Sequence, residues 1–393
     1  MSMSGVPTSE RLHIGFFGNR NSGKSSLINA LTGQNVSIVS DIPGTTTDPV
    51  KKTMELLPLG PVVIIDTPGV DDVGELGLER VSRTKNVLET CNIAVVVINS
   101  EKGVTEADSN LIEEIKGRKI PYIVCYNKSD LYSCDAGVNE ICVSAKTGMN
   151  IELLKNKLAS FADIKNEKYI IRHMLTKGDI VVLVIPIDSS APKGRIILPQ
   201  QQTLREVLDA GCVCICVQPD ELLQIIEKYN REIKVIITDS QVFGKVSKVV
   251  PSYIYLTSFS ILMLNYKGEL EQGAENVKTI NELKDGDRVL IAEGCTHHRQ
   301  CNDIGTVKLP NLIRKTTKAD VVFDFTSGGD FPEDLSPYKL IIHCGGCMLT
   351  EHEVKNRLFK AAEKNIPMTN YGIALAYMNG ILERSLEFIR KRR

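Results

Sequence analysis

An eight-residue loop near the start of the chain has the residue types and spacing of a phosphate-binding site. It is Gly18-Asn19-Arg20-Asn21-Ser22-Gly23-Lys24-Ser25, and it lies between a predicted strand and a predicted helix. Its glycines let backbone N–H groups surround phosphate oxygens, and the helix adds the positive end of its dipole. We expect Lys24 to reach the β- and γ-phosphates and the Ser25 hydroxyl to bind Mg²⁺, with Ser26 also in the nucleotide site.

Three shorter motifs follow in order, each at the end of a predicted strand. In Asp66-Thr67-Pro68-Gly69 the carboxylate can hold Mg²⁺ through water, and the glycine N–H can contact the γ-phosphate. In Asn127-Lys128-Ser129-Asp130 the last carboxylate can accept both N–H donors of guanine's Watson–Crick edge, a pattern that adenine lacks. Ser144-Ala145-Lys146 places a backbone N–H near guanine O6. Together the four motifs predict binding of GTP and GDP, and hydrolysis of GTP.

A long polar loop, residues 36–52, separates the first two motifs. Loops of this length are often functional. We expect Thr46 to complete the magnesium shell when GTP is bound. The residue after Gly69 is Val70, so a glutamine that would orient the attacking water is missing, and Asp71 or Glu75 are weak substitutes. Hydrolysis is therefore expected to be slow.

The phosphate loop and the loop after it resemble those of the septum-site and tRNA-modifying branch of small bacterial GTPases. The shared features are Asn21 and the segment Gly44-Thr45-Thr46-Thr47-Asp48. In that branch the asparagine coordinates a potassium ion that replaces an arginine finger. The resemblance therefore implies that Asn21 binds K⁺.

A second group of chemically capable residues lies between positions 295 and 352, which hold four of the six histidines and four of the eleven cysteines. Cys295-Thr296-His297-His298 follows one predicted strand, and His343-Cys344-Gly345-Gly346-Cys347 follows another. A Cys-x-x-Cys pair around a Gly-Gly turn can place both sulfurs on one ion or cluster, and Cys295 and a histidine can supply further ligands. The spacing alone does not separate zinc from an iron–sulfur cluster.

The other cysteines are predicted to be reduced core residues rather than ligands or disulfides. Cys212, Cys214 and Cys216 occupy one face of an apolar strand. The same interpretation applies to four more: Cys91, Cys125, Cys134 and Cys142.

Composition limits the classes of protein that the chain can belong to. A length of 393 residues predicts two or three domains, and the net charge of −1 argues against a protein that holds nucleic acid mainly through its phosphates. No signal peptide is predicted, and no run approaches the roughly 20 apolar residues of a membrane span. The basic run 390–393 is interpreted as a solvated helix end. We therefore expect a cytoplasmic protein that binds neither nucleic acid nor membrane.

Hydrophobic periodicity predicts three α/β regions. In the first, strands and helices alternate, which indicates a parallel sheet covered on both faces. Its strands are predicted at 12–17, 62–65, 93–98, 122–126 and 141–143, and its helices at 24–31, 78–89, 106–116 and 151–161. A charged connector at 165–168 leads to strands at 181–187, 212–217, 235–238 and 254–256, with helices at 202–209, 220–229 and 258–265. After a polar stretch at 266–287 come strands at 288–292, 321–325 and 340–343 and helices at 351–364 and 373–390.

The order of these motifs resembles that of the FeFe-hydrogenase maturation GTPases, the HydF family, over the whole chain. The resemblance implies a P-loop GTPase domain at 1–165, a dimerisation domain at 166–266 and a cluster-binding domain at 267–393. It also implies that Cys295, Cys344 and Cys347 hold a 4Fe-4S cluster. The fourth iron would then be open or weakly met by His297, His298 or His343.

What the family does follows from the resemblance and not from composition. Its members act as homodimeric scaffolds and carriers, which receive the diiron precursor of the hydrogenase active site and pass it to the apo-hydrogenase. The radical-SAM maturases of the same pathway are the other implied partners. Nucleotide turnover would switch these contacts rather than perform the assembly chemistry.

Two other functions remain open on the residues alone. One is a ribosome- or tRNA-associated GTPase with a structural zinc at the same cysteines and histidines. The near-neutral charge and the lack of a recognisable RNA-binding module count against it. The other is an electron-transfer enzyme, for which the sequence holds no flavin or nicotinamide fingerprint.

Overall fold

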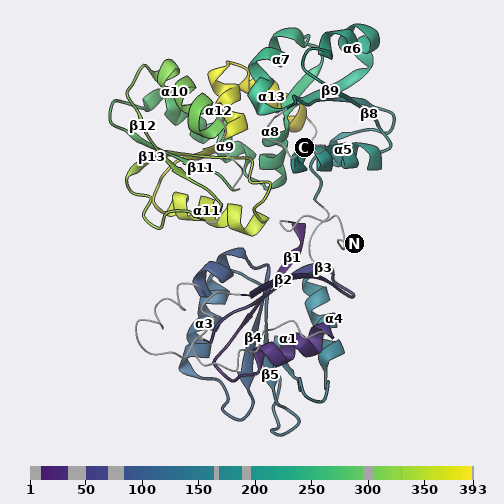
Figure 1. Ribbon diagram of the computed structural model, residues 1–393, viewed down its shortest axis with the longest axis vertical. Coiled ribbons are helices and arrows are strands. Elements are labelled where there is room, and N and C mark those ends of the chain that lie inside the picture. The colour runs from purple at the N-terminus through teal and green to yellow at the C-terminus, as the bar shows by residue number, and fades with distance from the viewer. Residues whose placement is uncertain are drawn as a thin grey trace. The chain divides into compact units, whose positions relative to one another are not determined.

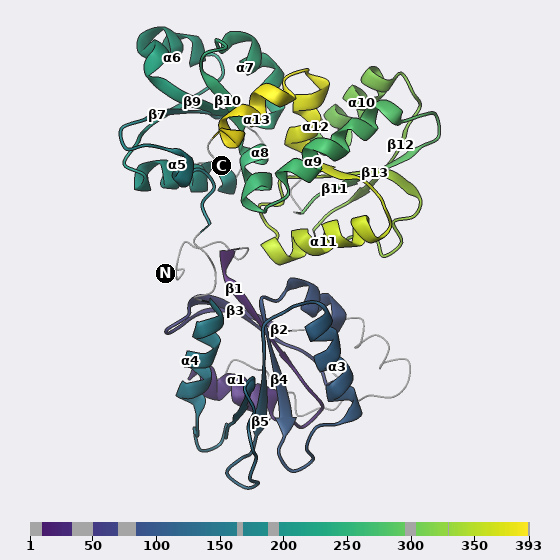
Figure 2. The same ribbon diagram turned by 180° about the vertical axis from the view of Figure 1, so that it is seen from behind.

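The structure, a computed structural model, describes residues 10–33, 50–69, 84–162, 168–187, 196–294, 304–328 and 330–391. The chain forms two compact units, residues 1–166 and 167–393. Figures 1 and 2 show the units from opposite sides. Across the described residues, none of the helices combines the length and the apolar character needed to cross a bilayer.

The first unit is built on a six-stranded sheet with the order β2-β3-β1-β4-β5-β6. Its strands are β1 (Leu12–Phe17), β2 (Val50–Leu56), β3 (Gly60–Asp66), β4 (Ile93–Asn99), β5 (Tyr122–Asn127) and β6 (Glu140–Cys142). Its helices are α1 (Lys24–Thr32), α3 (Glu106–Gly117) and α4 (Ile151–Ala162), with a further helical segment at 84–90. All neighbouring strands pair in parallel except β2 and β3, which pair antiparallel.

Two apolar layers cover the two faces of this sheet. Ile14 and Phe16 of β1 pack in one layer with residues of α1 and α4, whereas Phe17 packs in the other with residues of α3. The ribbon accordingly shows α1 and α4 on one side of the sheet and α3 on the other (Figure 1). Successive side chains of β1 point to opposite faces of the sheet, and both faces are covered. The strand is therefore buried along its whole length.

Strand β2 was not predicted, and its first residues lie in the segment expected to be loop. Lys51, Thr53 and Glu55 are exposed, while Val50, Lys52 and Met54 are half-buried. The strand lies at the sheet edge, so one face meets water and charged residues interrupt its apolar pattern. A pattern of that kind does not separate an edge strand from a polar loop.

The second unit holds two four-stranded sheets, both parallel throughout. The first has the order β10-β9-β7-β8, and the second β12-β11-β13-β14. The strands are β7 (Ile180–Val184), β8 (Val213–Val217), β9 (Ile233–Thr238), β10 (Tyr255–Ser258), β11 (Arg288–Ala292), β12 (Val322–Thr326), β13 (Tyr338–His343) and β14 (Met368–Asn370). The helices are α5 (Leu198–Asp209), α6 (Leu222–Tyr229), α7 (Phe243–Val249), α8 (Phe259–Tyr266), α9 (Leu270–Asn276), α10 (Leu309–Thr317), α11 (Glu351–Glu363), α12 (Tyr371–Met378) and α13 (Leu382–Arg390).

One hydrophobic core runs through both sheets of this unit. It includes Val182 of β7 and Ile291 of β11, and also Phe388 of α13. The ring of Phe388 lies 5.6 Å from that of Tyr255 in β10, so the last helix of the chain packs against the first sheet of the unit. The predicted boundary between residues 266 and 267 therefore stays a prediction, because the two parts share a core.

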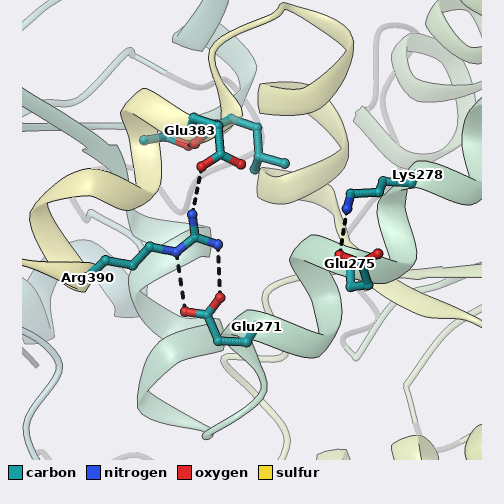
Figure 3. Close-up of polar contacts among 7 residues, drawn as sticks. Glu271, Glu275, Lys278, Glu383 and Arg390 are labelled. Atoms are coloured by element: carbon teal, nitrogen blue, oxygen red, sulfur yellow. Dashed lines mark hydrogen bonds and ion pairs between the residues drawn. The ribbon is translucent and has the colours of Figure 1, made fainter.

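A cluster of charged residues joins α13 to α9 on the surface of the unit. Arg390 donates to Glu271 of α9 at 2.9 Å and to Glu383 of its own helix at 2.7 Å, while Lys278 pairs with Glu275 nearby (Figure 3). Exposed pairs of this kind contribute about 0–1 kcal/mol each. They orient α13, and the buried apolar face of that helix supplies the stability.

The C-terminal helix predicted at 373–390 is two helices. Residues 379–381 separate α12 from α13, and Gly380 has φ of +69°, which only glycine adopts at little cost. The polar stretch at 266–287, predicted as a boundary, contains α9. Its buried Leu270 and Ala274 belong to the shared core, so this stretch is partly helical and partly buried.

The cysteines predicted to be core residues divide into two groups. Cys91, Cys125 and Cys212 are buried, as predicted. Cys216 is exposed and Cys214 half-buried, because β8 lies at a sheet edge.

The prediction was also wrong for Cys134 and Cys142, which are half-buried and joined by a disulfide. Their Cα atoms are 6.2 Å apart, a separation that a disulfide spans. Residue 134 lies in the loop before β6 rather than in the core.

Candidate functional site

The phosphate-binding loop depends on backbone conformations and close contacts that only certain residues allow. Gly18 has φ of +139° and Gly23 has φ of +88°. A Cβ atom at Gly18 would lie 2.2 Å from the Val97 carbonyl oxygen, and one at Gly23 would lie 2.2 Å from Nδ2 of Asn127. Asn21 also has a positive φ, of 61°, which asparagine tolerates better than most residues. The sequence motif thus reflects a shape that the chain adopts.

Lys24 and Ser25, at the start of α1, occupy the positions expected for a phosphate and magnesium site. The Lys24 ammonium is buried and donates to the carbonyls of Gly18 and Asn19 at 2.8 and 2.9 Å. The Ser25 hydroxyl donates to Oδ2 of Asp66 at 2.9 Å. The carboxylate at the end of β3 therefore meets the hydroxyl at the start of α1.

Asp66 has the features of a carboxylate that faces a hydrated cation. Burial raises the pKa of this carboxyl above its ordinary value, although the hydrogen bond from Ser25 and the charge of Lys24 both lower it. Its Oδ1 atom is buried and has no hydrogen-bond partner among the described residues, and the same is true of Oγ of Ser22. Such atoms are costly without a partner, so they fit a site for Mg²⁺ and phosphate.

Asn127 ties the phosphate loop to the loops expected to bind the base. Its Nδ2 donates to the Ser22 carbonyl at 3.1 Å, and its Oδ1 accepts from the N–H of Ala145 at 3.1 Å. Ser144 is buried, while Asp130 is exposed, as a side chain that recognises an incoming base should be. The structure therefore brings these three sequence motifs together.

A contact that the sequence motifs do not indicate links the phosphate loop to α3. Asn19 donates to Oγ1 of Thr105 at 2.8 Å and to Oδ2 of Asp108 at 3.1 Å, the two residues that cap the helix. A cavity of about 350 Å³ lies beside this contact, lined by residues of the phosphate loop, the end of β4 and the start of α3. The capping pattern was visible in the sequence, but Asn19 occupies a position where the motif accepts any residue.

Several residues of the predicted sites lie outside the described residues. They are Thr46 with the rest of segment 44–48, Asp71, Glu75, Cys295, His297 and His298. Gly69 is described, and a Cβ atom there would lie 2.8 Å from the backbone nitrogen of Arg20. The Asp-Thr-Pro-Gly segment thus packs closely against the phosphate loop.

The loop of residues 344–350, called the cysteine loop below, begins where β13 ends. Ala292 of β11 pairs with His343 of β13, which places Gly294 beside Cys344. The Sγ atom of Cys344 accepts N–H groups from Gly294 at 3.0 Å and from Gly346 at 3.3 Å. Cys295, the next residue in the sequence after Gly294, lies outside the described residues.

A buried lysine lies under this loop, and no sequence pattern pointed to it. Lys267 donates from Nζ to the carbonyls of Gly346 and Leu349 at 2.8 and 2.9 Å. Burial lowers the pKa of its ammonium, and the negative charges of Cys347 and Cys344 oppose that effect. Burial also raises the pKa of the Cys347 thiol to about 11, with Cys344 adding to the rise and Lys267 opposing it.

His343 is held in place by hydrogen bonds to both ring nitrogens. Nδ1 lies 2.8 Å from the carbonyl oxygen of Cys344, and Nε2 lies 3.0 Å from Nη1 of Arg357. A carbonyl only accepts and a guanidinium only donates, so Nδ1 carries the proton and Nε2 accepts. The ring therefore supports the loop, and neither nitrogen is open to a metal.

Within the described ranges, no three Cys, His, Asp or Glu side chains form a group that could hold a metal ion. The described donors of the predicted cluster site are Cys344 and Cys347. Two sulfurs on a glycine turn, with amide N–H groups directed at one of them, fit an iron–sulfur cluster because amide donors stabilise bound thiolates. Zinc would accept the same sulfurs.

Models of known families match three consecutive parts of the chain. The 50S ribosome-binding GTPase model matches residues 13–128. The hydrogen maturase F dimerization domain matches residues 170–268, and the hydrogen maturase F tetramerization domain matches residues 271–388. The last two together cover more than half of the chain.

Individual relatives resemble part of the chain. The tRNA modification GTPase MnmE of Laribacter hongkongensis is 35% identical over 159 residues, which is 38% of this chain and 34% of that protein. The GTPase Der of Chloroflexus aurantiacus is 38% identical over 129 residues, 32% of this chain and 28% of that protein. The chain thus spans about a third of the length of these curated relatives. A crystal structure of Era with MgGDPNP and 16S ribosomal RNA nucleotides covers 53% of this chain and 94% of its own, at 19% identity and a TM-score of 0.36, and we draw nothing from a likeness this low.

The family matches and the sites agree in their order along the chain. The GTPase match contains the phosphate loop and Asp66, and the hydrogen maturase F matches contain Lys267 and the cysteine loop. The predicted fold class is confirmed, a P-loop GTPase fold followed by two α/β regions. The chain therefore belongs to the HydF family of hydrogenase maturation GTPases.

Proposed function

We propose that this chain is a GTP-hydrolysing scaffold that binds a 4Fe-4S cluster and delivers the diiron precursor of the FeFe-hydrogenase active site to the apo-hydrogenase. The observation that carries the proposal is the pair of N–H groups, from Gly294 and Gly346, that donate to the sulfur of Cys344. One comes from Gly294, which follows β11 and precedes Cys295 in the sequence, and the other from Gly346, which precedes Cys347. The radical-SAM maturases of the pathway would supply the precursor.

The ligands of the cluster would be Cys295, Cys344 and Cys347. A cluster held by three thiolates keeps one iron whose remaining position can exchange, and a carrier needs firm anchoring together with one exchangeable position. Because His343 is held by Arg357 and the Cys344 carbonyl, we propose that His297 or His298 meets the fourth iron weakly or that it stays open. The cargo or its bridging ligand would take that position.

The GTPase site would work with the residues brought together at the ends of β1, β3 and β5. Lys24 and the Gly69 N–H would contact the γ-phosphate, and Ser25, Thr46 and Asp66 would surround Mg²⁺. Asn127 would hold the phosphate loop and base loop together, and Asp130 would recognise guanine. Magnesium and the lysine would neutralise the charge that develops during phosphoryl transfer.

Lys24→Ala should lower GTP hydrolysis by at least about a hundredfold, because it removes a charge aimed at the transferring phosphate. Asp130→Asn should shift preference from GTP towards xanthosine triphosphate, since an amide can donate to the 2-oxo group that xanthine carries. Steady-state release of phosphate from each nucleotide measures both effects. Lys278→Ala, at an exposed site in the other unit, is the control. Normal hydrolysis by Lys24→Ala would refute the assignment.

Potassium should stimulate hydrolysis more than sodium does. Asn21 stands in the phosphate loop with a side-chain oxygen of the type that K⁺ accepts, and a cation there would act as an arginine finger does. The comparison requires initial rates in KCl and NaCl at matched ionic strength, for the parent chain and for Asn21→Ala. Equal rates in the two salts for the parent chain would remove Asn21 from this role.

The chain should form a homodimer through β8. This strand is one of two edges of its sheet, and the other edge, β10, is covered by α13. Val213 of β8 is 50% exposed, and an open edge has backbone groups that pair readily with another strand. Val213→Lys should shift the sedimenting species from about twice 43.4 kDa to 43.4 kDa. The matched control is Val322→Lys, on the edge strand β12 of the other sheet. A parent chain that sediments only as a monomer at micromolar concentration contradicts the proposal.

The cluster proposal predicts that anaerobically prepared protein is brown and contains iron, and that Cys344→Ala and Cys347→Ala lose both. GTP hydrolysis should survive, because the phosphate loop lies in the other compact unit. Cys216→Ala removes an exposed thiol of the same unit and should keep the iron. Iron and zinc analysis with electron paramagnetic resonance of the reduced protein provides the measurement. Colourless protein with one bound zinc would instead support the structural-zinc alternative.

A further inference from the structure

We propose that the buried charge of Lys267 makes the cluster bound at the cysteine loop easier to reduce. Lys267 also holds the loop in shape through its hydrogen bonds. The inference rests on the proposed cluster site. It concerns a residue of this chain that no motif of the sequence includes.

The position of Lys267 at the end of α8 explains how its ammonium reaches the buried side of the cysteine loop. The residue caps the C-terminal end of α8, donating its backbone N–H to the carbonyls of Met263 and Asn265. Its side chain turns inward and is only 4% exposed. Nζ then donates to the carbonyls of Gly346 and Leu349, which stand on either side of Cys347 in the sequence.

The carboxylates of Glu351 and Glu353 already have partners of their own. Glu353 accepts from the backbone N–H and the hydroxyl of Thr350, at 2.7 and 3.0 Å. Glu351 accepts from Lys168 at 2.5 Å and pairs with Lys355 at 2.7 Å. The hydrogen bonds from Nζ of Lys267 go instead to the two carbonyls of the loop that carries Cys344 and Cys347.

A neutral donor would suffice if the only task were to hold two carbonyls. Moving an ammonium group from water into a protein interior costs several kcal/mol of free energy, and hydrogen bonds to carbonyls alone do not recover that cost. The cavity beside the loop, which Lys267 helps to line, has a volume of about 20 Å³, space for about one water molecule. A full positive charge in such a poorly solvated place is stabilised most when the loop binds a negatively charged group.

A cluster with three thiolate ligands becomes more negative by one charge when it is reduced. A fixed positive charge in a poorly solvated site stabilises the more negative state, because little water screens the attraction. Lys267 should therefore raise the reduction potential. It belongs to the segment that matches the dimerization domain, whereas the sulfurs belong to the tetramerization domain match.

Helix α8 supports the loop at a second point. A Cβ atom at Gly345 would lie 3.6 Å from the hydroxyl of Ser260. The same hydroxyl accepts from the N–H of Gly372, and the Ser260 carbonyl accepts from Asn370. Lys267 is thus held by a helix that is itself fixed in the core, so its charge keeps a constant place relative to the sulfurs.

The test measures the reduction potential of the full chain with its cluster, titrated with dithionite and followed by electron paramagnetic resonance. Lys267→Met removes the charge and should fold, because an apolar side chain in place of a buried charge is often neutral or stabilising. At a fixed potential its ratio of reduced to oxidised cluster should fall about tenfold, equivalent to about 59 mV for one electron. Lys267→Gln, which keeps N–H donors, should show the same shift. Lys278→Gln, an exposed lysine of the same unit, should show none.

Unchanged potentials in both Lys267 variants, at the iron content of the parent chain, would overturn the inference. If the parent chain holds no iron, the proposed function fails, and the countercharge is tested with zinc alone. Lys267→Met should then weaken zinc binding about tenfold in competition with a chelator, since the thiolates lose their countercharge. Equal zinc affinity in parent and variant would overturn the inference in that case.

Discussion

Parallel pairing of buried strands is the constraint on which both candidate sites depend. In a parallel sheet the carboxyl ends of all strands lie on the same side of the sheet, so loops far apart in the chain meet there. In the first unit this brings the phosphate loop after β1 to Asp66 at the end of β3 and to Asn127 at the end of β5. In the second unit it brings Gly294, after β11, to Cys344, after β13. Each site is a set of loops held by strands whose central residues are buried.

Both sites also contain a buried lysine that donates to two carbonyls of the loop it serves. Lys24 donates to the carbonyls of Gly18 and Asn19, and Lys267 to those of Gly346 and Leu349. Lys24 also lies close enough to the Asp66 carboxylate for the two charges to interact, since the charge of Lys24 lowers the pKa of Asp66. Burying a cation is costly, and a bound anion beside it offsets part of that cost. The common arrangement is consistent with phosphate as the anion in one unit and an anionic cluster in the other.

The sequence predicted those parts of the sites whose residue types are imposed by local geometry. The positive φ angles and close contacts at positions 18 and 23 require glycine. The glycines of the motif therefore predict the shape of the loop directly. Lys267 and Arg357 were not predicted, because each acts through a contact with residues distant in sequence and each is a single basic residue with no accompanying pattern. Cys216 was predicted to be buried because the apolar run around it is typical of a central strand. The order of strands, which local patterns do not contain, places it at an edge.

The shared core of the second unit joins its two family segments into one compact unit. Helix α13 closes the chain against β10, and α8 supports the cysteine loop through Ser260 and Lys267. Residues of both helices, such as Leu262 and Phe388, belong to the same hydrophobic core as β7 and β11. Opening that core would expose apolar surface of both sheets at about 25 cal/mol per Å². The edge strand proposed to pair with a second copy and the loop proposed to hold the cluster are therefore stabilised by the same burial.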